Sequence, residues 1–153
     1  MRLSLMVTAL LFPVAISAQT ANGAHATPAL KWGPAPPAFP AGAQLAVLQG
    51  DPGQAGEYAV RLRMPAGYRI QPHTHPTDEN VTVISGHLMV GMGDSFTTKS
   101  ALSMPVGAFA TAPANQPHFA WTKGRTTLQV HGMGPFQLTY VNPADDPQNK
   151  KPK

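Results

Sequence analysis

Cysteine is absent from this chain of 153 residues, which excludes disulfide bridges, thiol nucleophiles and thiolate metal sites together. Charge is also scarce, with 11 basic and 7 acidic residues. The formal net charge of +4 arises at the two ends of the chain, from Arg2 and from three lysines that follow Asn149. Between Gln19 and Asn149 the basic and acidic residues are equal in number, and no basic cluster forms. A neutral body of this kind excludes nucleic-acid binding.

Only one long apolar stretch is present, at residues 3–16, and it is too short to span a bilayer comfortably. It follows the positive Arg2 and precedes the small residues Ser17 and Ala18, an order typical of a Sec-type secretory signal peptide. We predict cleavage after Ala18, with cleavage after Ala26 as the alternative. The mature protein is then expected to be exported, periplasmic or secreted, without an integral membrane segment.

Helices are disfavoured throughout, because 17 prolines and 14 glycines interrupt the sequence. Short segments show a strand-like alternation instead, with Tyr58, Val60, Leu62 and Met64 on one face of segment 58–64. Turn residues separate these segments, so the sequence predicts a single antiparallel β-sandwich or barrel. We expect strands at residues 43–49, 58–64, 68–71, 79–84, 87–91, 108–112, 118–122, 126–132 and 136–141.

The sequence divides into four parts by composition. An arm rich in proline, alanine and glycine precedes the strands, and a polar tail follows them. Trp32 and Phe39 of the arm could contact a second copy in a homodimer or wrap their own barrel, and both alternatives are open. The predicted parts are a signal peptide (1–18), an extended arm without regular structure (19–42), a β-domain (43–141) and a polar tail (142–153).

Three of the six histidines fall where a metal ion would need them. His73 and His75 are two residues apart, so in extended backbone they point to one face. Glu79 begins the next predicted strand, and His118 begins a later one. Three neutral imidazoles and a carboxylate suit one divalent transition metal (Mn, Fe, Ni, Cu or Zn) rather than Ca or Mg. The alternative is four polar side chains that hydrogen-bond inside the barrel without a metal.

The spacing around these residues is similar to the two motifs of the cupin superfamily. Gly67, His73, His75, Glu79 and Gly86 follow one another at the intervals of the first cupin motif. This motif supplies three of the four residues of the predicted metal site.

The second cupin motif resembles the segment from Gly107 through Pro113, Asn115 and His118 to Thr122. Asn115 replaces the glycine of the family pattern, and Thr122 replaces its asparagine. Asn tolerates a left-handed backbone conformation, so the turn can survive the first change. Neither departure removes a metal ligand.

The resemblance covers about residues 44–141 and implies an all-β fold, a single cupin double-stranded β-helix or jelly-roll barrel. It implies that His73, His75, Glu79 and His118 bind one metal ion inside the barrel mouth. Glu79 could also act as a catalytic base by leaving the metal, as in some relatives with this ligand set.

Several other residues are candidates for a role near the site. Strand parity puts Arg69 and Gln71 on the face of His73, where Arg69 could bind an anionic group of a substrate or act as a salt-bridged residue at the rim. We expect His131 to be a hydrogen-bonded histidine rather than a fifth ligand. Phe119 falls on the face opposite His118 and is expected to pack in the core or a dimer interface.

Four protein ligands leave open positions on a metal with octahedral preference, so substrate or O₂ can bind there. We therefore expect a metal-dependent oxidoreductase of the dioxygenase type that acts on a small organic molecule. A non-redox lyase, isomerase or hydrolase is one alternative. A metal- or small-molecule-binding protein without turnover is another, because the fold and ligands do not select the reaction.

Overall fold

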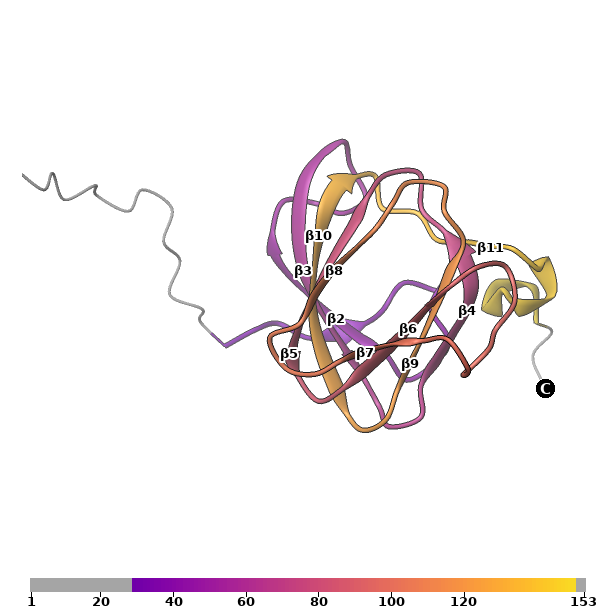
Figure 1. Cartoon of the computed structure of the whole chain (residues 1–153). Helices are drawn as coiled ribbons and strands as arrows, with labels where there is room; N and C mark the ends of the chain where they lie inside the picture. The colour runs from indigo at the N-terminus through magenta and orange to yellow at the C-terminus, as the bar shows by residue number, and fades with distance from the viewer. Residues whose placement is uncertain (1–28, 151–153) are drawn as a thin grey trace, which may run out of the picture.

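The computed structural model describes residues 29–150 (Figure 1). The predicted signal peptide (1–18) and the first part of the predicted arm lie outside these residues. Nearly all regular structure is β, as predicted. The strands are β1 (Gly33–Pro34), β2 (Gln44–Gln49), β3 (Gly56–Met64), β4 (Arg69–Thr74), β5 (Glu79–Ser85), β6 (Leu88–Met92), β7 (Leu102–Met104), β8 (Phe109–Ala112), β9 (His118–Thr122), β10 (Thr126–Gly134) and β11 (Thr139–Tyr140).

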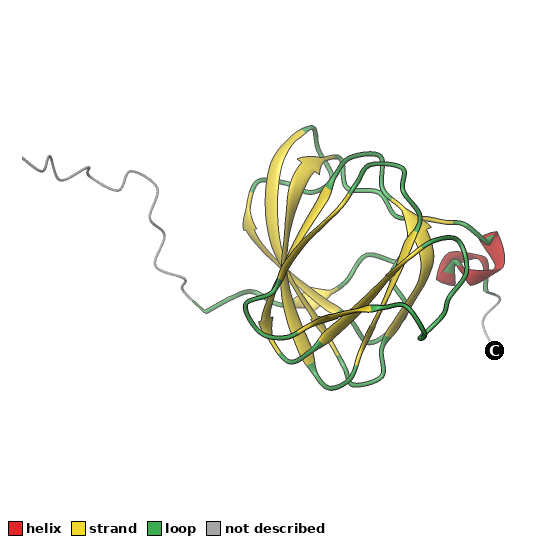
Figure 2. Ribbon diagram, viewed as in Figure 1, coloured by secondary structure: helices red, strands yellow, loops and turns green. Residues whose placement is uncertain are grey.

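The strands form two antiparallel sheets that curve around a common interior (Figures 1 and 2). One sheet has the order β1-β2-β3-β10-β5-β8, and the other has the order β11-β4-β9-β6-β7. Edge strands β7 and β8 belong to different sheets and are joined by a turn. Within residues 29–150, no helix has the length and apolarity that a bilayer crossing requires.

The alternation of β3 explains its place in the barrel wall. Tyr58, Val60, Leu62 and Met64 are buried, while the residues between them are half-buried. β10 pairs with β3 over its whole length and brings further apolar side chains to the same interior. Burial of apolar area at about 25 cal/mol per Å² is the main term that holds the two sheets together.

The described part of the arm packs on its own barrel. β1 pairs with β2, and Phe39 is buried in the main core cluster. The hydroxyls of Tyr68 and Tyr140 donate hydrogen bonds to the carbonyl groups of Pro40 and Ala38, respectively. The arm was predicted without a strand, so the short pairing of β1 is a difference from the prediction.

Other element boundaries differ where tertiary pairing decides the structure. β7 was not expected, and only Thr139 and Tyr140 of the expected strand 136–141 form a strand, where they pair with β4. Two short 3₁₀ helices, η1 (Pro143–Asp145) and η2 (Pro147–Asn149), occupy the polar tail. Asn142 and Asp146 cap them by accepting backbone hydrogen bonds.

Candidate metal centre

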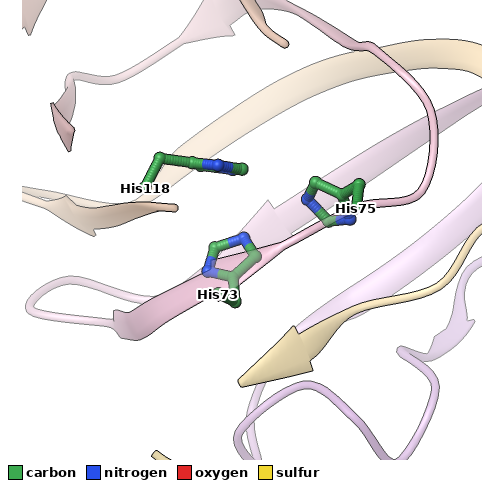
Figure 3. A group of neighbouring side chains, drawn as sticks. All are labelled: His73, His75 and His118. Carbon is green, nitrogen blue, oxygen red and sulfur yellow. The ribbon is translucent and has the colours of Figure 1, made fainter. Parts of the chain in front are cut away.

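Three histidines from two neighbouring strands meet at one point inside the barrel. His73 lies near the end of β4, His75 directly follows β4, and His118 opens β9. His73 and His118 are directly opposite each other in the β4–β9 ladder. The three imidazoles offer one nitrogen each within 4.8 Å of one another, and all three side chains are buried (Figure 3). Residues 45 positions apart in the chain thus form a single cluster.

Backbone carbonyl groups orient all three rings. The Nδ1 atoms of His73, His75 and His118 lie 2.7, 2.6 and 3.0 Å from the carbonyl oxygens of Gln71, Gln137 and Gln116. A carbonyl oxygen only accepts hydrogen bonds, so each Nδ1 is the protonated nitrogen and donates. The neutral ring then carries its lone pair on Nε2, the arrangement typical of metal-binding histidines.

Glu79 completes the group from the first position of β5. Its Oε2 lies 3.5 Å from Nε2 of His75 and 3.6 Å from Nε2 of His118. These separations exceed the roughly 2.7–2.9 Å that is usual for a charge-assisted hydrogen bond. They leave room for an ion bonded to each atom at about 2.0–2.2 Å.

Two of these imidazole nitrogens are buried and unsatisfied. Nε2 of His75 and Nε2 of His118 have no hydrogen-bond partner. Lone pairs that face a carboxylate in a buried site are costly unless a positive charge lies between them. A cation satisfies all of these atoms at once, so the residues fit a metal ion, and the three histidines could hold one.

The pKa values of the group agree with this arrangement. Burial lowers the pKa of His73 to about 3, with help from neighbouring His118 and His75. Burial alone would raise the pKa of Glu79, but the imidazoles of His118 and His75, 3.6 and 3.5 Å from its carboxylate, outweigh burial and hold that pKa well below its ordinary value. His73 is therefore neutral and Glu79 is ionised near neutral pH, the forms that bind a metal.

An apolar cavity of about 160 Å³ adjoins the cluster. His73, Glu79 and His118 form its polar end. Most of the remaining wall comes from aliphatic and methionine side chains of both sheets. These wall residues are Phe39, Leu62, Met64, Ile70, Val81, Leu88, Val90, Met92, Leu102, Met104, Ala110, Thr111, Ala112, Ala120, Leu128, Val130 and Leu138.

Arg69 and Gln71 were expected on the inner face, and the structure corrects this. Neither lines the cavity. The register of the β4–β9 pairing shifts between Ile70 and His73. Both residues are therefore buried, although strict alternation would put residues three positions apart on opposite faces. Arg69 is exposed, and its guanidinium lies 5.3 Å from the ring centre of Phe96 on the outside of the barrel. Gln71 contributes only its backbone carbonyl to the site.

The remaining sequence candidates lie away from the cluster. The ring centres of His131 and Phe109 lie 6.4 Å apart. The buried Nδ1 of His131 has no hydrogen-bond partner, which differs from the hydrogen-bonded histidine that was expected. Phe119 is fully buried, and Phe96 covers it together with Trp121. This aromatic packing accounts for Phe119 within a single copy of the chain.

Sequence reasoning missed the groups that hold the histidine rings. The three carbonyl acceptors belong to the backbone, so their residue types carry no signal. Phe136 also lies against His75, with ring centres 5.0 Å apart. Phe136 was expected to begin the strand 136–141, but it precedes β11 in the structure, and nothing in the sequence put it beside the site.

Comparisons with known proteins agree with this fold. The family model DUF4437, described as a domain of unknown function, matches residues 13–139. The polyketide cyclase RemF from Streptomyces resistomycificus aligns with 15% identity and a TM-score of 0.65, over 78% of this chain and 84% of its own. No curated protein matches the chain.

Two further solved structures share the fold. A candidate acetylacetone dioxygenase from Methylibium petroleiphilum aligns with 21% identity and a TM-score of 0.60, over 77% of this chain and 79% of its own. An RmlC-like cupin from Shewanella frigidimarina aligns with 14% identity and a TM-score of 0.55, over 69% and 84% of the two chains. The family match covers most of the chain, so the chain belongs to the DUF4437 family, and its two antiparallel sheets give it the fold of these cupin structures.

Proposed function

We propose that the protein is an exported, metal-dependent oxidoreductase of the dioxygenase type that acts on a small organic molecule. The observation that carries the proposal is the convergence of three imidazole rings and one carboxylate at the end of an apolar cavity. His73, His75, His118 and Glu79 would hold one divalent transition metal (Mn, Fe, Ni, Cu or Zn). When bound, a redox-active ion with open positions would supply the electrons and the binding sites that O₂ chemistry needs.

The protein residues have distinct tasks in this proposal. The carbonyl groups bound to each Nδ1 hold the rings in one orientation and one tautomer. The apolar wall excludes water from the polar end of the cavity. Glu79 is the one carboxylate that lines the described cavity, so its Oε2 is the natural acceptor for a proton taken from a bound substrate.

A non-redox reaction is the second candidate. Among the structures aligned above, a cyclase has the highest TM-score, while a candidate dioxygenase aligns with higher identity. At these identities both support only the shared fold, so the same barrel could host either chemistry. Export would also favour zinc or copper, because a chain that crosses the membrane unfolded takes up its metal outside the cytoplasm.

Oxygen uptake tests the proposal. We suggest isolating the mature protein from a periplasm, loading separate samples with iron, manganese, nickel, copper or zinc, and recording oxygen consumption with a panel of small oxygen-containing compounds. We expect turnover with a redox-active metal and not with zinc. Glu79→Gln should abolish it, whereas His131→Gln, a histidine outside the cluster, should retain it. Turnover by the zinc form without O₂ would contradict the oxidoreductase and favour the second candidate.

A further inference from the structure

The wall of the inner cavity lacks side chains that could bind a polar or highly charged molecule. No lysine or arginine of the described residues lines it. Outside the metal cluster, Thr111 is the one polar wall residue, and its hydroxyl already donates to Oδ1 of Asn80 at 2.9 Å. Apart from this hydroxyl, a ligand finds hydrogen-bonding side chains only at the metal end of the cavity.

The size of the cavity limits the ligand. An engineered cavity of about 150 Å³ lined by Leu, Ile and Phe accommodates benzene. The cavity described here has a similar volume, about 160 Å³. A body of about six to eight non-hydrogen atoms is therefore the largest that fits without rearrangement of the wall.

The way into the cavity is apolar as well. Met92 and Leu102 line the cavity and are 49% and 57% exposed, so they lie at its mouth. Met92 ends β6, and Leu102 begins edge strand β7. A ligand that enters here leaves water along an apolar surface, which favours an apolar body.

The charge of the metal end limits the head group. Three neutral imidazoles and one ionised carboxylate around a divalent ion leave a single net positive charge. One singly charged oxygen group balances it. A second anionic group would be buried in the apolar wall without a partner, which is strongly unfavourable.

We propose that the cavity selects a small, mostly apolar molecule with one metal-binding oxygen group, and rejects polyhydroxylated molecules and dianions. This inference rests on the proposed function, because it places the oxygen group on the metal. Hydroxyl groups along the molecule would lose water and gain no partner in the wall, so sugars and sugar acids bind poorly.

Zinc-loaded protein allows a test that needs no turnover. Ligand-observed NMR titrations would compare pentanoate, glycerate and succinate, which share a carboxylate head and are similar in size. Glycerate adds hydroxyl groups and succinate adds a second carboxylate. We expect pentanoate to bind about tenfold more tightly, or better, than either of the others.

Two substitutions to leucine locate the binding. Ala110→Leu fills the cavity from β8, and we expect it to weaken pentanoate binding about tenfold or more with unchanged zinc content. Ala59→Leu, on β3 outside this cavity, should leave pentanoate binding unchanged. Leu102 is exposed at the mouth, so Leu102→Lys should not disturb folding. The added positive charge should reduce the preference for pentanoate over succinate.

The outcomes separate the two proposals. A protein that takes up no zinc would contradict the proposed function and this inference with it. A zinc-loaded protein that binds glycerate or succinate as tightly as pentanoate, or that binds no pentanoate, would overturn the inference alone. Unchanged pentanoate binding in Ala110→Leu would place the ligand elsewhere and would also overturn it.

Discussion

Zinc should stabilise the protein against heat, and His118→Ala should remove most of this effect. A ligand present at about 1,000 times its Kd stabilises a folded protein by about 4 kcal/mol. For a domain of this size each kcal/mol raises Tm by about 2–4 °C, so zinc should raise the Tm of the wild-type protein by roughly 8–16 °C. His118 supplies one of the three clustered nitrogens and one of the two that face Glu79. Its loss should weaken zinc binding about 100-fold, which leaves about 1.4 kcal/mol and a rise of roughly 3–6 °C.

Differential scanning fluorimetry with and without zinc measures these shifts within each variant, so any change in the metal-free Tm cancels. His131→Ala is the matched control, because His131 lies outside the cluster and should keep the full zinc shift. A zinc shift of wild-type size in His118→Ala would refute the assignment of His118. Loss of the shift in His131→Ala would show that zinc binds elsewhere on the barrel.

Two further predictions concern packing and pH. Gly91→Ala should lower stability by about 1–3 kcal/mol in thermal denaturation, because the added Cβ would lie 2.1 Å from Cζ of buried Phe119. Gly124→Ala, where no atom lies within 4 Å, is its control, and equal stability of the two variants would contradict the packing. Metal occupancy should fall as pH decreases. Burial lowers the pKa of His75, but the nearby negative charge of Glu79 outweighs burial and raises that pKa above its ordinary value. Protons therefore compete with the metal for His75 as pH falls, and full occupancy at pH 4.5 by metal analysis would count against the site.

Much of the barrel wall was predictable because β3 is buried on one face only and turn residues bound the other strands. The predicted segment 118–122 coincides with β9, and the alternation around Val60 and Leu62 identified β3. β7 was not predicted, because a segment of three residues shows no readable period. Its pairing with β6 is a tertiary contact that local sequence does not encode.

The grouping of the histidines was predictable because motif spacing fixes where each strand begins. The surroundings of the site were not. The register shift after Ile70 moved Arg69 to the outer face, and strict alternation cannot anticipate such a bulge. The carbonyl group of Gln137 that orients His75 comes from a segment 62 residues further along the chain. A backbone contact between such distant segments depends on the fold, so the residue types do not reveal it.

Metal content of the purified protein tests the central claim most directly. We would isolate the mature wild-type chain and a His75→Ala/His118→Ala variant from a periplasm and analyse both by plasma mass spectrometry. The account predicts about one equivalent of a transition metal in the wild type and its loss in the variant. Absence of metal from both proteins, even after reconstitution with each candidate ion, would contradict a metal centre at these histidines.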